Sequence, residues 1–238
     1  MTRRSRAYLL LIVIMALAAP AAMAQMSAKE KASQVKKAGE TSKKAAKVMD
    51  ELMRIPASSI PESLLSKAKA IAVFPGVKKV AFGIGGSGGQ GLISRRLASG
   101  WSAPVAFKLA QGSLGFQIGA SSTDYVLLIM NDDGLRHLLG NKFELGGEAS
   151  VAAGPVGRTG AATTDAELQA EILSYSRSKG LFAGISLKGG AISPDNDRNM
   201  ALYGFEAKEL LTGDNKIAIA NIPAATRTFH QSITRAAK

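Results

Sequence analysis

The sequence predicts an α+β fold: a curved, mainly antiparallel, glycine-rich β-sheet or partial barrel with several short helices and a long N-terminal helix. Apolar runs of strand length recur at hairpin-like intervals through the middle of the chain. Many of the 25 glycines fall within or beside these runs, where glycine permits tight bends and coiling of a sheet. Segments with helix-capping and helix-stop residues interrupt the strands, so we expect helices among them.

Length and composition predict a single globular domain with a real core. The chain has 238 residues, of which 46% are hydrophobic and 20% charged. Aromatic residues make up only 5%, so the core must rely on Val, Ile, Leu and Ala. No Pro/Ser-rich linker divides the chain beyond its N-terminal helix, and we expect residues 55–238 to fold as one unit.

The first 24 residues have the features of an export signal that is cleaved from the mature protein. Three arginines within residues 3–6 precede an apolar stretch at residues 7–19, which is short for a membrane span. Ala22-Met23-Ala24 then fits the small-x-small rule of signal peptidase, with cleavage before Gln25. We therefore expect a periplasmic or secreted protein. The alternative is an uncleaved anchor.

The mature chain is basic and has no cysteine. Loss of the three leader arginines lowers the formal net charge from +12 to +9. Such a domain prefers anionic surfaces, either lipid headgroups or nucleic acid, and export disfavours nucleic acid. The alternative is that the charge serves solubility or a loose attraction to an acidic envelope. Without cysteine the chain forms no disulfides, although export would permit them.

Residues 25–54 are predicted to form a basic N-terminal helix, because residues 26–54 are rich in Ala, Lys, Glu and Met and contain no proline. One stripe along this segment has the alternating spacing of four and three that marks the seam of a heptad repeat. Its members are Ala28, Ala32, Val35, Gly39, Ser42, Ala46, Met49 and Met53. We expect close packing along the stripe, either on the domain or on a second copy in a homo-oligomer.

Lysines on another face of this helix allow two interpretations. Lys29, Lys36, Lys43 and Lys47 form either a solvated face or a contact with anionic headgroups. A membrane-surface helix usually carries Trp, Phe or Leu on its apolar face, and the small stripe has none of these. The lysines would still add electrostatic attraction of about 1 kcal/mol each near an anionic surface.

A short helix at residues 62–69 is predicted to open the domain, followed by strands. The strand-like segments are residues 70–74, 77–84, 92–93, 102–110, 113–120, 124–130, 142–152, 184–187 and 191–192. We expect turns at Pro75-Gly76 and Gln111-Gly112, and a hairpin at the glycine run 85–91.

Four further helices are predicted from capping and stop signals. They occupy residues 132–140, residues 164–175, residues 205–211 and a terminal segment from Pro223 onward. The second of them begins with the capping box Thr164-x-x-Glu167.

The chain lacks the residue patterns that catalytic sites usually contain, so we expect a non-enzymatic protein. His137 and His230 lie far apart in the sequence, outside any metal or base motif. Ser176-x-x-Lys179 matches the opening of a penicillin-binding signature, but its companion motifs are absent. Gly83-x-Gly85-x-x-Gly88 formally matches a dinucleotide fingerprint, but no helix-forming segment follows it.

A calcium site is the one cofactor alternative that the sequence offers, and otherwise we expect no cofactor. Its candidate ligands have the spacing of an EF-hand loop and are Asp195, Asp197, Asn199 and Glu206. Met200, however, stands where that loop needs glycine for its turn. The competing interpretation is a polar turn capped by Asp and Asn.

Two basic pairs are predicted to lie at the rim of the sheet. Lys78-Lys79 follows the Pro-Gly turn, and Arg95-Arg96 follows the glycine hairpin. Cations at strand ends beside a flexible glycine loop could hold phosphate groups. The alternative is scattered, solvated charge.

Several ordered motifs between residues 55 and 211 resemble the SYLF domain family. They include Ala-Ile-Ala-Val-Phe-Pro at residues 70–75, Trp-Ser-Ala-Pro at 101–104, Gly-Phe-Gln-Ile-Gly-Ala at 115–120 and Ala-Ala-Gly-Pro-Val-Gly-Arg at 152–158. Further matching blocks are residues 60–69, 82–86, 128–131, 175–184 and 201–204. The chain is similar to a bacterial, exported member of this family, which is related to a fungal actin-regulator domain.

The resemblance implies a non-enzymatic domain that binds membrane lipids. Eukaryotic members favour phosphoinositides, with an N-terminal amphipathic segment implicated, and some fungal members bind actin. Because this chain carries a predicted export signal and no SH3 or FYVE partner domain, we expect peripheral association with an anionic phospholipid membrane at the cell envelope, and not with actin. The N-terminal positions that the resemblance assigns to lipid are Lys36, Lys37, Lys43, Lys44 and Lys47.

Overall fold

The structure is a computed structural model, and every structural statement refers to the residues that it describes. These are residues 26–54, 59–82, 84–114, 119–140, 142–157, 169–178, 181–212 and 217–237. The predicted export signal at residues 1–24 lies outside them, as do the capping box Thr164-x-x-Glu167 and Lys179.

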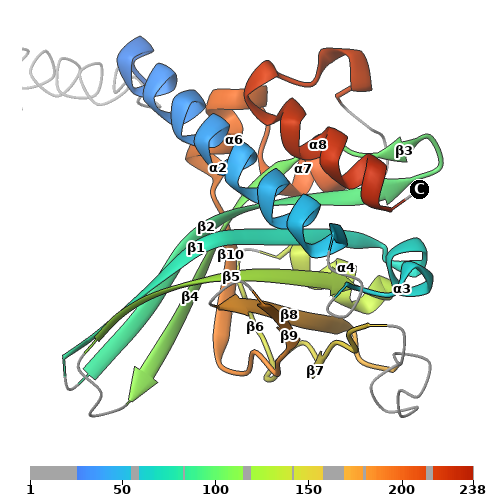
Figure 1. Cartoon of the computed structure of the whole chain (residues 1–238). Coiled ribbons are helices and arrows are strands. Elements are labelled where there is room, and N and C mark those ends of the chain that lie inside the picture. The colour runs from blue at the N-terminus through green and yellow to red at the C-terminus, as the bar shows by residue number, and fades with distance from the viewer. Residues whose placement is uncertain are drawn as a thin grey trace, which may run out of the picture.

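Ten strands form one curled, mixed sheet, which confirms the predicted α+β class (Figure 1). The strands are β1 (Ala70–Phe82), β2 (Ile84–Leu97), β3 (Gly100–Trp101), β4 (Val105–Leu114), β5 (Gly119–Ile129), β6 (Phe143–Glu144), β7 (Val151–Ala153), β8 (Ile172–Ser178), β9 (Leu181–Gly184) and β10 (Gly190–Pro194). Their order is β6-β10-β4-β2-β1-β5-β8-β7, with β3 paired to β2 and β9 to β8. Among the described pairs, β7 with β8 is parallel and the others are antiparallel.

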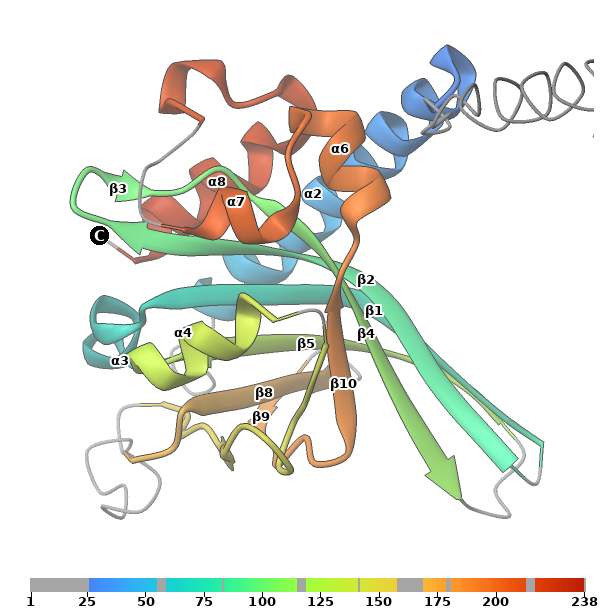
Figure 2. The ribbon, with the colours of Figure 1, turned by 180° about the vertical axis from the view of Figure 1, so that it is seen from behind.

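Helices lie on both sides of this sheet (Figures 1 and 2). They are α2 (Ala28–Arg54), α3 (Glu62–Lys67), α4 (Asp132–Leu138), α6 (Asn196–Tyr203), α7 (Ala207–Leu211) and α8 (Ala224–Ala236), with a 3-10 turn η2 (Ile219–Asn221). The long N-terminal helix and the helices at α3, α4, α7 and α8 were predicted. Helix α6 was not predicted, because Asp197 and Asn199 are residues typical of the polar turn that the sequence indicates there.

Strand alternation divides the core into two layers, because successive side chains point to opposite faces of a sheet. On one face, Ile71 and Val73 pack with buried residues of α2, α3 and α8. We call this the helical face. On the other, Ala70, Ala72 and Phe74 pack with residues of α4, α7 and the curled edge of the sheet. We call this the inner face.

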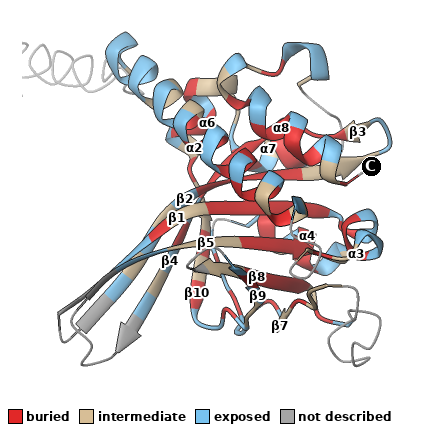
Figure 3. Cartoon of the chain, in the orientation of Figure 1, coloured by how far each residue is buried: buried red, intermediate tan, exposed pale blue. Residues whose placement is uncertain are grey.

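The predicted small-residue stripe packs within the chain, against α8. The buried residues of α2 run from Ala38 to Leu52, and a Cβ added to Gly39 would lie 3.8 Å from Ala225. None of residues 28–37 is buried, and this end of α2 projects from the body (Figures 1 and 3). The half of the stripe left open for a second copy is therefore the half before Ala38.

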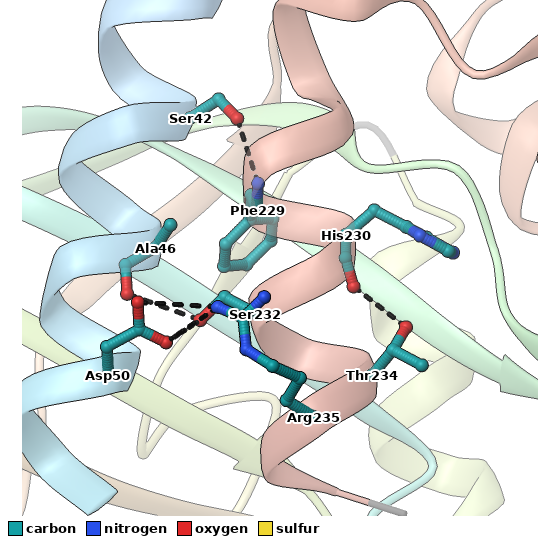
Figure 4. A network of polar contacts seen from close by, with 8 residues as sticks. All are labelled: Ser42, Ala46, Asp50, Phe229, His230, Ser232, Thr234 and Arg235. Carbon is teal, nitrogen blue, oxygen red and sulfur yellow. Dashed lines mark hydrogen bonds and ion pairs between the residues drawn. The ribbon is translucent and has the colours of Figure 1, made fainter. Parts of the chain in front are cut away.

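Hydrogen bonds between hydroxyl groups and backbone fix the crossing of α2 and α8 (Figure 4). Ser42 Oγ accepts from the Phe229 amide at 3.1 Å, and Ser232 Oγ lies 3.2 Å from the Ala46 carbonyl. Asp50 then accepts from Ser232 at 2.8 Å and pairs with Arg235 at 3.1 Å. Small side chains bring the two helices close enough for these contacts.

Two expected turns and the expected glycine hairpin are absent, because the strands continue through these segments. Pro75-Gly76 forms a bulge within β1, where the register shifts against both neighbouring strands. Gly76 takes φ +61°, a left-handed conformation that favours glycine, and its amide donates to Asp124 Oδ1 at 2.7 Å. Gln111-Gly112 lies inside β4, and the glycine run 85–91 lies inside β2.

The helix predicted at residues 164–175 is wrong over its described end, because residues 172–175 belong to β8. Ile172, Leu173, Ser174 and Tyr175 are all buried, so both faces of this strand are covered. A run buried on both faces carries no periodicity that separates strand from helix. Pairing with β5 and β7 decided the outcome.

The uninterrupted strands carry the sheet beyond its covering helices. We call the part that leaves the body the extension, which consists of residues 78–82 of β1, 84–90 of β2, 110–114 of β4 and 119–124 of β5. The side chains described there are half-buried or exposed, in contrast to the buried body (Figure 3). The extension therefore offers both of its faces to solvent or to a ligand.

Replacing Gly91 with alanine is expected to destabilise the fold, by about 1–3 kcal/mol. The added Cβ would fall inside the contact distance of the Phe74 ring and the Val73 carbonyl, both in the core. Gly112→Ala is the control, because nothing lies within 4 Å of the added atom. Urea unfolding of both variants measures the effect, and a Gly91→Ala protein as stable as the parent would contradict this packing.

Candidate functional site

A basic cleft of about 500 Å³ lies between α2 and the helical face at the root of the extension. Its lining residues are Thr41, Lys44, Pro75, Gly76, Lys78, Gly88, Gly89, Gln90, Lys108 and Leu109. We call this set the basic cleft. It combines one helix with three neighbouring strands, so residues far apart in the sequence meet there.

Strand register places the polar side chains on the floor of the cleft. Lys78 of β1 pairs with Gly88 of β2, and Gln90 of β2 pairs with Lys108 of β4. Glycine at position 88 leaves bare backbone beside the Lys78 side chain. Lys44 comes from α2, on the opposite wall.

The cleft lining contains three ammonium groups and no carboxylate. Lys44 and Lys78 have no ion-pair partner within the described part of the chain. Lys108 Nζ lies 3.1 Å from Asp195 Oδ1, behind the lining. An excess of one sign of charge in a concave site attracts ions of the opposite sign, so the cleft suits an anion.

A buried arginine supports the floor of the cleft from behind. Arg198 is 1% exposed, and its Nη2 donates to Gln90 Oε1 at 2.8 Å. This bond leaves the Nε2 donor of Gln90 free for the cleft. Nη1 of Arg198 lies 3.6 Å from Asp195, while Nε and Nη1 make no hydrogen bond within the described residues. Burial lowers the pKa of Arg198, and the Asp195 carboxylate opposes that shift.

The four residues of the calcium alternative do not form a loop. Asp195 is buried between Lys108 and Arg198, and the carboxamide of Asn199 makes two bonds to the Ala106 backbone, at 2.7 and 3.1 Å. Asp197 lies exposed in the first turn of α6, and Glu206 caps α7. Within the described residues, no group of three His, Cys, Asp or Glu side chains could hold a metal ion.

Arg95 and Arg96 hold the fold together and lie outside the basic cleft. Arg95 Nη1 donates to the Leu211 carbonyl at 2.5 Å. The Arg96 guanidinium lies 4.4 Å from the centre of the Trp101 ring, and burial lowers its pKa. It donates at 2.8–3.2 Å to the carbonyls of Leu65, Ala68 and Ala237. These contacts engage part of the donor set of each guanidinium in the fold, and the phosphate-binding role expected of this pair stays a prediction.

The other predicted lysines divide between three surfaces. Lys78 enters the basic cleft, whereas Lys79 lies on the inner face, because adjacent strand residues point in opposite directions. Lys44 is the helix lysine that lines the cleft. The remaining helix positions are exposed along α2: Lys36, Lys37, Lys43 and Lys47.

Sequence reasoning missed Lys108, Gln90 and Arg198. Lys108 interrupts an apolar strand, Val105–Leu114, and that interruption was the available signal. Gln90 sits at the end of the glycine run, with no local feature that marks it as a ligand contact.

None of the described helices is both long and apolar enough to cross a membrane.

Residues 110–236 match the Ysc84 family, described as Las17-binding protein actin regulator. The match covers more than half of the chain. The chain belongs to this family, the SYLF family. The family is one of binding and regulatory proteins, not of enzymes.

Relatives of the SYLF chain include yeast and vertebrate proteins. LAS seventeen-binding protein 3 of Saccharomyces cerevisiae is 38% identical over 160 residues, which cover 65% of this chain and 35% of the yeast protein. SH3 domain-containing YSC84-like protein 1 of Xenopus laevis is 36% identical over 183 residues, covering 73% of this chain and 54% of the frog protein. The chain thus spans about a third to a half of the relatives that it matches.

Arg96→Lys is expected to lower the free energy of unfolding by about 2–3 kcal/mol, because it keeps the charge but loses the planar set of donors. Trp101, the single tryptophan, packs against this guanidinium and reports the change by fluorescence during denaturant unfolding. Arg54→Lys, at an exposed helix end, is the matched control. Equal stability of the two variants would refute the structural role of Arg96.

Proposed function

We propose that this chain is an exported, non-enzymatic protein that binds anionic phospholipid headgroups at the cell envelope, with the basic cleft as the headgroup site. The observation that carries this proposal is the meeting of Lys44, Lys78 and Lys108 in one hollow without a carboxylate in its lining. A phosphodiester would replace water as the partner of the Lys44 and Lys78 ammonium groups, while Lys108 keeps its ion pair with Asp195. The Nε2 donor of Gln90 would add a directional hydrogen bond.

The exposed lysines of α2 support the same proposal, because they extend the basic surface from the cleft along the helix. Lys44 belongs both to the helix and to the cleft, so a membrane that lies along the helix also reaches the cleft. Lys36, Lys37 and Lys43 have no ion-pair partner within the described residues, whereas Lys47 lies 3.8 Å from Glu51. Each lysine near an anionic surface adds about 1 kcal/mol of attraction, and salt screens that attraction.

The mature protein is expected to float with vesicles of phosphatidylglycerol or cardiolipin, and not with phosphatidylcholine vesicles. Lys44→Met together with Lys78→Met should weaken the partition onto anionic vesicles by about tenfold or more, since two attractive charges are lost. Flotation at low and at high salt measures both effects.

The control for this experiment is a second double variant with the same loss of charge. Lys67 and Lys208 are exposed, lie outside the cleft and have no ion-pair partner within the described residues. Lys67→Met together with Lys208→Met should keep most of the binding. An equal loss in both double variants would mean that net charge, and not the cleft, governs binding.

A second candidate function follows from the family description, which names an actin regulator. An acidic protein filament would also be attracted to the basic face of α2. Co-sedimentation of the mature chain with filamentous actin tests this alternative. We expect no saturable pelleting, because an exported protein does not meet actin and has no need of a surface that fits the filament. Saturable co-sedimentation would favour the second candidate.

A further inference from the structure

Four strands of the extension bring polar side chains into one row on the inner face. Gln111 of β4 pairs with Ser87 of β2, Ser87 pairs with Lys79 of β1, and Lys79 pairs with Ser121 of β5. Residues directly opposite one another in neighbouring strands lie on the same face, so the row crosses the sheet at right angles to the strands.

This row lies in a small pocket that begins where the inner core ends. The pocket has a volume of about 140 Å³ and is bounded on its core side by Val77, which is 2% exposed. Thr123 and Tyr125 of β5 complete it. The sheet itself separates this inner pocket from the basic cleft, since Lys78 and Lys79 point to opposite faces.

The inner pocket presents many hydrogen-bonding groups but a single charge. Ser87, Ser121, Thr123 and Tyr125 supply hydroxyl groups, which both donate and accept. Gln111 Nε2 donates to the Lys188 carbonyl at 3.3 Å, which leaves its Oε1 as an acceptor for a ligand. Burial raises the pKa of Tyr125, so its phenol stays protonated at neutral pH.

Lys79 is the one charged side chain of this pocket, and it has no ion-pair partner within the described residues. A solvated sheet face commonly pairs opposite charges across strands, whereas Lys79 has Ser87 and Ser121 as its two cross-strand neighbours. The chemistry therefore favours a ligand that brings one anionic group for the ammonium group and several hydroxyl groups for the rest of the row.

We propose that the inner pocket binds a small polyol with one anionic group, either a phosphate ester or a carboxylate. At roughly 30 Å³ per water molecule, its volume matches a ligand about as large as a few waters, such as a glycerol phosphate. Because the pocket opens on the face opposite the basic cleft, a protein bound to a membrane through the cleft leaves it accessible. This proposal is independent of the lipid-binding function.

Calorimetry of the mature protein with glycerol 3-phosphate, gluconate, glycerol and inorganic phosphate tests the proposal. We expect saturable binding of at least one of the anionic polyols, about tenfold or more tighter than glycerol or phosphate alone. Lys79→Met should weaken that binding about tenfold or more, because a charge-assisted hydrogen bond is lost. Lys67→Met, at an exposed lysine that lines neither the inner pocket nor the basic cleft, should leave it unchanged.

Two outcomes would overturn the proposal. One is the absence of saturable binding for both anionic polyols. The other is an equal loss of affinity in the Lys67→Met and Lys79→Met proteins, which would reflect net charge alone. Lys79 is exposed, so its variant should keep the unfolding midpoint of the parent, and that measurement verifies that the variant is folded.

The same glycerol phosphate chemistry exists in a free metabolite and in a phosphatidylglycerol headgroup, and flotation separates the two sources. If the inner pocket takes a soluble polyol, Lys79→Met floats with phosphatidylglycerol vesicles as the parent does. If it takes the lipid headgroup, Lys79→Met floats more weakly with phosphatidylglycerol than the parent does, although its basic cleft is intact. Failure of all flotation with intact polyol binding would reject only the lipid-binding function.

Discussion

The alternation of side chains along four long, unbroken strands is the constraint on which the rest of the structure depends. In the body, both faces of β1, β2, β4 and β5 are apolar, so the sheet needs a layer on each side. The helices α2 and α8 supply one layer, and the curled edge with α4 supplies the other. Where those layers end, the same alternation carries polar side chains onto two solvent-accessible faces, and each face has its own hollow.

The basic side chains of this protein have two roles, a structural one and a candidate ligand-binding one, and their surroundings distinguish the two. Arg95 and Arg96 hold backbone carbonyls, and Arg198 holds the side chains of Gln90 and Asp195; the planar guanidinium suits such fixed, multiple contacts. Lys44 and Lys78 lie at a surface with no carboxylate beside them. Because their ammonium groups have no ion-pair partner among the described residues, these two lysines are the better candidates for binding an anion.

Helix α2 links the fold to the candidate function. Its second half is fixed by close contact with α8, through small residues and the bonds of Ser42 and Ser232. That fixed half also presents Lys44 to the basic cleft, so the same packing that anchors the helix positions one wall of the site. The first half, residues 28–37, has no buried residue and extends the lysine-bearing face away from the body.

The sequence by itself determined the α+β class, the long helix at residues 28–54, the terminal helix after Pro223 and the family, because each rests on local periodicity, capping or ordered motifs. It wrongly predicted turns at Pro75-Gly76 and Gln111-Gly112, because strand pairing across the sheet overrides the local turn preference of these residues. Only the tertiary structure separated Arg95-Arg96 from Lys78-Lys79, two basic pairs that look alike in sequence. The physical reason is that a binding site depends on which distant strands and helices become neighbours, and that is decided by the packing of the whole chain.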